Sequence, residues 1–99
     1  MFSWFNAKTA KDFGLQLAEF FIAEMPTEVA ARKDKTLKKR IKVIQKMEAK
    51  IKDFRQENSL NIYKKAQFGN AFKWHLLEQG FDKEVVEEVT SIVMQEIAK

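Results

Sequence analysis

One stretch of the sequence holds the end of one predicted helix and the start of the next: Leu76-Leu77-Glu78-Gln79-Gly80-Phe81-Asp82-Lys83-Glu84-Val85-Val86. Gly80 readily adopts the left-handed conformation that ends a helix. Asp82 then stands at an N-cap position, and Glu84 lies in the first turn, where the helix dipole favours negative charge. Phe81 and Val86 have the spacing of a hydrophobic staple. We therefore predict a helix on each side of this turn.

The segment that follows the turn is rich in β-branched residues, so a strand is the competing interpretation. Its apolar residues recur at helical spacing from Val85 to Ile97. The whole chain has only three Gly and one Pro, whereas a many-stranded β-fold needs turn residues every 8–12 positions. These observations favour a helix over about 82–97.

Three more segments have a helical period, over about 9–25, 35–56 and 60–79. Thr9 and Asp12 resemble a capping box at the start of the first, and Pro26 ends it. We expect an extra short helix or turn near 27–33 and a break near 33–36. Either Ser59 or Asn61 can cap the helix over 60–79.

Ninety-nine residues, 45% of them hydrophobic and 32% charged, fit one small globular domain. The predicted fold class is all-α: a small antiparallel helical bundle of about four helices that spans residues 1–99 as a single helical domain.

The pattern also predicts how the helices pack. The second helix has an apolar stripe at spacings of three and four, formed by Leu37, Ile41, Ile44, Met47, Ile51 and Phe54. Apolar residues cover most of the circumference of the helix over 60–79, so we expect it to be the most buried, with Gly69 marking close approach of another helix. Glu48 and Lys73 interrupt apolar stripes, and they either form an interhelical ion pair or extend to the rim.

The sequence supplies little for catalysis. His75 is the only histidine and there is no cysteine, so a two-histidine zinc motif and a thiolate site are impossible. None of the three serines lies in a G-x-S-x-G turn, and the glycines form no phosphate-binding loop. We predict no enzyme, no catalytic or metal-binding residues and no cofactor.

A basic run is the strongest departure from an ordinary surface. Residues 32–55 contain eleven Lys or Arg and three acids, in a chain whose net charge is +4. Lysines at every fourth position form a ridge along one face of the second helix, which we call the lysine ridge: Lys38, Lys42, Lys46 and Lys50. The ridge is either a solvated face or a site for nucleic acid or another polyanion, because phosphate attraction needs only positive charge.

Excess apolar surface is the second departure. The apolar arc of the first helix exceeds half of its circumference, wider than one contact face requires, and aromatic residues precede it. The N-terminal aromatics either cap the bundle core or join an interface. The predicted interface residues are Phe2, Trp4, Phe5, Leu15 and Ile22.

We therefore expect a non-enzymatic interaction module that self-associates, as a dimer, or binds a protein partner. Non-specific nucleic-acid or polyanion binding through the lysine ridge is the alternative. The N-terminus lacks the apolar stretch of a secretory signal, and no run approaches the ~20 apolar residues of a membrane-spanning helix. The expected location is the cytoplasm, with no integral membrane segment.

Overall fold

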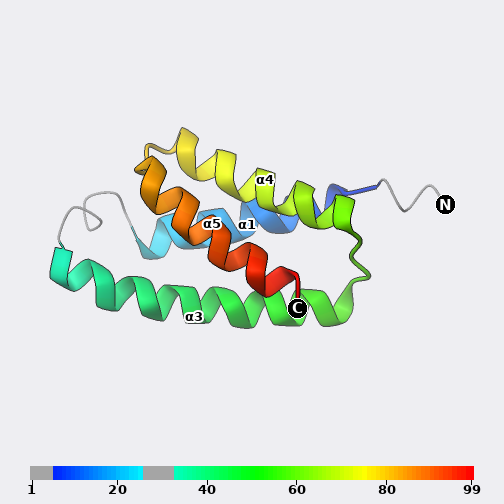
Figure 1. The fold of residues 1–99 in the computed structure, drawn as a ribbon, viewed down its shortest axis with the longest axis horizontal. Coiled ribbons are helices and arrows are strands. Elements are labelled where there is room, and N and C mark those ends of the chain that lie inside the picture. The colour runs from blue at the N-terminus through cyan, green and yellow to red at the C-terminus, as the bar shows by residue number, and fades with distance from the viewer. Residues whose placement is uncertain (1–5, 26–32) are drawn as a thin grey trace.

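The computed structural model describes residues 6–25 and 33–99, with the side chains of residues 6–25 and 39–99. Four α-helices make up the described chain: α1 (Lys8–Glu24), α3 (Lys33–Glu57), α4 (Ile62–Glu78) and α5 (Lys83–Ile97) (Figure 1). No strand occurs in these residues, so the all-α prediction is confirmed, including the helix over the β-branched C-terminal segment. The short helix expected near 27–33 falls largely outside the described residues. The break expected at 33–36 is wrong, because α3 is helical from Lys33 onward.

Capping determines where α4 and α5 begin. The Asn61 side chain accepts a hydrogen bond from the Lys64 backbone N–H at 2.8 Å, and Asp82 accepts one from the Glu84 N–H at 2.8 Å. Gly80 lies between the two helices with a φ of 90°. The Phe81 N–H donates to the Leu76 carbonyl at 3.3 Å across that glycine, as in a Schellman motif. The predicted caps at these helix ends are confirmed.

The start of α1 differs from the prediction. Ala7 is the N-cap and gives no side-chain hydrogen bond, and the helix begins before Thr9, so the predicted capping box is wrong. Asn6 takes over part of this role, because its side-chain oxygen accepts from the Lys8 N–H at 3.2 Å. Ala7 is buried, and Ala10 in the first turn belongs to the core.

Consecutive helices run antiparallel, which brings α1 and α4 parallel to each other and α3 parallel to α5 (Figure 1). The most extensive packing joins α1 to α4, followed by α4 to α5 and α3 to α5. By contrast, α3 barely touches α4 although the two are joined by a short turn. Glu48 and Lys73 lie on these separated helices, and no ion pair joins them within the described residues. Of the two alternatives for these residues, the interhelical ion pair is therefore wrong.

Two glycines mark the closest approaches between helices. A Cβ added at Gly14 of α1 would lie 2.5 Å from the Phe68 carbonyl oxygen of α4, so the two backbones meet there directly. A Cβ added at Gly69 of α4 would instead overlap the Met94 side chain of α5. The prediction that Gly69 allows another helix to approach is confirmed.

The core lies between all four helices. Its largest fully buried side chains include Phe21 from α1, Met47 and Ile51 from α3, Phe68 and Phe72 from α4, and three valines with Ile97 from α5. Phe13 extends the core between α1 and α3, because its ring stacks on that of Phe54 with 4.1 Å between centroids.

One residue of the stripe predicted for α3 is misplaced. Val43, Met47 and Ile51 are buried at every fourth position, but Ile41 is 49% exposed. At 100° per residue, Ile41 lies about 120° around the helix from Met47, the middle of those three. Val43 occupies the core position that the sequence pattern had assigned to Ile41.

A candidate interaction surface on α1 and α4

Exposed apolar side chains gather on α1 and α4. Among the described residues, four large hydrophobic side chains are exposed, and three of them belong to this helix pair: Leu15 at 39%, Ile62 at 84% and Trp74 at 58%. The fourth, Ile41, lies on α3. Isolated apolar residues on a surface are ordinary, but exposed aromatic residues are enriched where proteins meet. The α1/α4 face is therefore the leading candidate surface.

A continuous exposed strip runs along α4, with a residue at every fourth position, and we call it the α4 strip. Its members are Ile62, Ala66, Asn70, Trp74 and Glu78, all of them exposed. Ala66 and Asn70 lie between its two large apolar residues, Ile62 and Trp74. The expectation that α4 is the most buried helix is wrong for this side.

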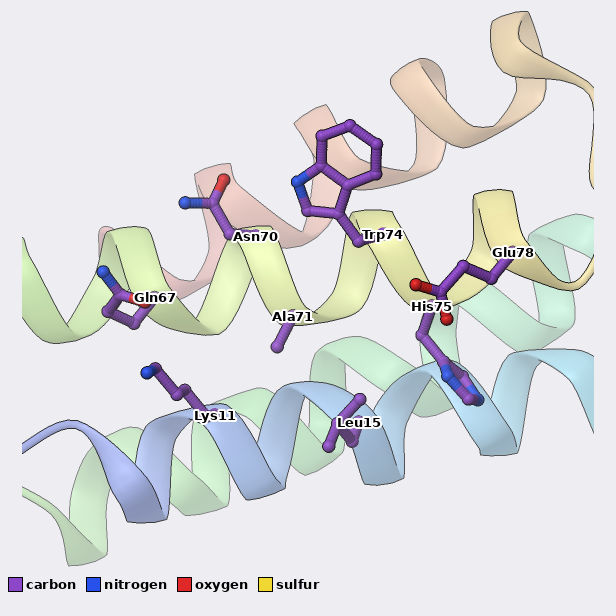
Figure 2. A pocket seen from close by; sticks show the side chains of 8 residues that line it. All are labelled: Lys11, Leu15, Gln67, Asn70, Ala71, Trp74, His75 and Glu78. Atoms are coloured by element: carbon purple, nitrogen blue, oxygen red, sulfur yellow. The ribbon is translucent and has the colours of Figure 1, made fainter.

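A shallow groove of about 240 Å³ lies between α1 and α4, and we call it the α1/α4 groove. Its lining residues are Lys11, Leu15, Gln67, Asn70, Ala71, Trp74, His75 and Glu78 (Figure 2). Ala71 and Leu15 face each other across its middle, and Trp74 stands on the outer side of α4 (Figure 2). Lys11 and Glu78 lie towards opposite ends of the groove. It therefore has an apolar centre and charged ends.

The structure brings only some of the predicted interface residues together. Leu15 lines the α1/α4 groove, whereas Ile22 is half-buried and packs against the core. Phe2, Trp4 and Phe5 lie outside the described residues. Sequence reasoning missed Trp74, because an all-round apolar pattern was interpreted as burial. The spacing of four from Ile62 to Trp74 was the signal that could have identified the exposed strip.

A second groove, of about 350 Å³, separates α1 from α3, which pack together only sparsely. Aromatic rings of Phe13, Phe20 and Phe54 line it. The Lys50 ammonium lies 4.8 Å from the centre of the Phe20 ring, a cation–π contact that covers part of the opening. Lys50 therefore contributes to packing as well as to the lysine ridge.

The lysine ridge is only partly matched by the protein's own acids. Lys42, Lys46 and Lys50 are exposed as predicted, and the side chain of Lys38 is not described. The Lys46 ammonium lies 3.5 Å from a Glu24 carboxylate oxygen of α1. Lys42 has no ion pair with a described residue. The ridge therefore keeps some positive charge without an acidic partner.

The acids of α5 pair with arginines of α3 instead. Arg40 lies 3.1 Å from Glu88, and Arg55 lies 3.1 Å from Glu96. Glu96 also accepts from the Lys99 ammonium at 3.2 Å and is the one charged residue buried in the described chain. These pairs hold α3 against α5, and they leave the lysine ridge outside the contact between these two helices.

The described residues contain no group of three or more His, Cys, Asp or Glu residues that could hold a metal ion. None of the helices they form is long and apolar enough to cross a membrane. Comparison of the chain with known protein families, curated proteins and solved structures gave no match.

Proposed function

We propose that this protein is a non-enzymatic interaction module that self-associates or binds a protein partner through the face formed by the α1/α4 groove and the α4 strip. The observation that carries the proposal is the exposure of Trp74, at 58%, beside a groove whose centre is Ala71 and Leu15. A tryptophan at this exposed position of α4 is not needed for the core of the bundle. The expected cytoplasmic location belongs to this proposal, supported by the absence of cysteine.

Burial of Trp74 supplies a useful amount of binding free energy. Its exposed area is roughly 120 Å², which corresponds to about 3 kcal/mol at the usual coefficient for apolar surface. The entropy lost on association opposes this gain. Leu15 lines the same groove and adds apolar area to this face, so Trp74 has the position of a binding hot spot.

Site-specific photo-crosslinking tests the proposal without assuming the partner. A benzophenone amino acid replaces Trp74 in one variant and Ile41 in a matched control, since Ile41 is an exposed apolar residue on α3. We expect a crosslinked protein product in cells from position 74 and none from position 41. Equal products from both positions, or none from position 74, would contradict the proposal.

Polyanion binding by the lysine ridge is the second candidate. It is supported by Lys42, which is exposed and has no ion pair with a described residue, next to Lys39, which is also exposed. Counterion release from a nucleic acid would then drive binding, so affinity must fall steeply as salt rises. A salt series of DNA and RNA binding tests this candidate directly.

A further inference from the structure

The α1/α4 groove has opposite charges towards its two ends. Lys11 of α1 lies beside Gln67, and Glu78 of α4 lies beyond His75 (Figure 2). Both charged residues are exposed, and neither forms an ion pair with a described residue. The groove is therefore positive towards one end and negative towards the other, with apolar side chains between.

This arrangement is complementary to itself. Because α1 and α4 run parallel, a two-fold rotation perpendicular to both helices, centred between Ala71 and Trp74, exchanges the two ends of the groove. The groove-lining residues of α4 then face each other in pairs: Gln67 opposite Glu78, Asn70 opposite His75, and Ala71 opposite Trp74. Lys11, which lies beside Gln67, meets Glu78. Each contact occurs twice, as in every isologous interface.

We infer that the occupant of the α1/α4 groove is a second copy of this chain, packed antiparallel about that two-fold axis. This inference rests on the proposed function and adds the partner and its orientation to it. Trp74 of each chain lies opposite the partner's Ala71, and Lys11 pairs with the partner's Glu78.

The size of the face sets the expected strength. Two helices of 17 residues each present a face about 25 Å long and about 20 Å wide, or roughly 500 Å² per chain. This is below the ~800 Å² per partner of a standard interface. The dimer should therefore be a weak one, and the measured mass should depend on protein concentration.

Charge reversal tests the pairing. Lys11→Glu and Glu78→Lys should each weaken the homodimer by about tenfold or more, because each variant places like charges together at two sites. An equimolar mixture of the two variants should dimerise as well as the wild type, since the heterodimer restores both opposite-charge pairs. Lys52→Glu, an exposed change on α3 with the same charge difference, is the control and should leave the dimer unchanged.

Sedimentation velocity gives the mass of each sample, and circular dichroism verifies that each variant is folded. Recovery of dimer only in the mixture would support the two-fold pairing. Single variants that dimerise like the wild type, or a mixture no stronger than either variant, would overturn it. A product of position 74 with another protein, together with a monomeric wild type, would overturn this inference and leave the proposed function intact.

Discussion

Replacing Gly14 with alanine perturbs the contact on which the α1/α4 face depends. Gly14 lies where the backbones of α1 and α4 meet, and an added Cβ would stand 2.5 Å from the Phe68 carbonyl oxygen and 3.2 Å from the Ala71 Cβ. The first of these neighbours is backbone, so it cannot turn aside as a side chain does. The methyl group can be accommodated only if the two helices move apart.

The magnitude follows from two opposing effects. Alanine in place of glycine stabilises a helix by about 1 kcal/mol, while forcing an extra methyl into a packed contact costs about 1–3 kcal/mol, and more where the backbone must shift. We expect Gly14→Ala to lower the free energy of unfolding by roughly 1–2 kcal/mol. For a domain of this size, that lowers the Tm by about 5–15 °C.

Gly69→Ala is the matched control. The atoms that an added Cβ would meet at Gly69 belong to the Met94 side chain, which is flexible and can repack. We expect its effect on the free energy of unfolding to stay within about 1 kcal/mol of zero. Urea denaturation followed by circular dichroism measures both variants. A Gly14→Ala protein as stable as the wild type, or less affected than Gly69→Ala, would refute the close approach of α1 and α4.

Two further changes test the charges. Replacing both Lys42 and Lys46 with Glu should leave the fold intact, because only the exposed Lys46–Glu24 pair is lost. If the second candidate function is right, the double change should abolish DNA and RNA binding in a filter or anisotropy assay. Binding that survives the change and does not depend on salt would eliminate the lysine ridge as the binding site. Glu96→Gln should lower the free energy of unfolding in urea by about 1–2 kcal/mol, because it removes the charge that Arg55 and Lys99 share. Glu88→Gln, whose side chain is 60% exposed, should cost under about 0.5 kcal/mol; equal effects would show that burial of Glu96 does not matter.

The sequence predicted the helix ends better than the helix neighbours. Asn61, Gly80 and Asp82 act on backbone groups within a few residues, so local pattern was enough to place them. The predicted cap at Thr9 was wrong because α1 begins earlier, at Lys8, directly after Asn6 and Ala7. A poor cap is tolerated where the first turn packs on the core. Local capping is visible in sequence, whereas the tertiary contact that overrides it is not.

The pairing of helices needed the structure. The short turn between α3 and α4 suggested neighbours in contact, yet α4 packs mainly on α1 and α5. This choice depends on Gly14, where the backbones of α1 and α4 meet, and on Gly69, against which the Met94 side chain packs. It moves Ile41 to the surface and Glu48 away from Lys73. The same arrangement exposes Trp74, because α4 packs mainly on two helices, α1 and α5, and its remaining side faces outward.

The candidate site was predicted in part. Excess apolar surface pointed to an interface, and Leu15 lies on the face that we now propose. The larger share of that surface belongs to α4, where an apolar residue can be either core or contact, and the sequence pattern is the same for both.

The mass of the protein in solution tests the central claim most directly. Sedimentation equilibrium over a range from about 1 to several hundred micromolar should show the wild type rise from 11.6 kDa towards twice that mass. Trp74→Ser should remain at the monomer mass, while Ile41→Ser, an equally apolar-to-polar change on α3, should follow the wild type. A wild type that stays at 11.6 kDa at every concentration, or a Trp74→Ser variant that associates as the wild type does, would contradict self-association through the α1/α4 face.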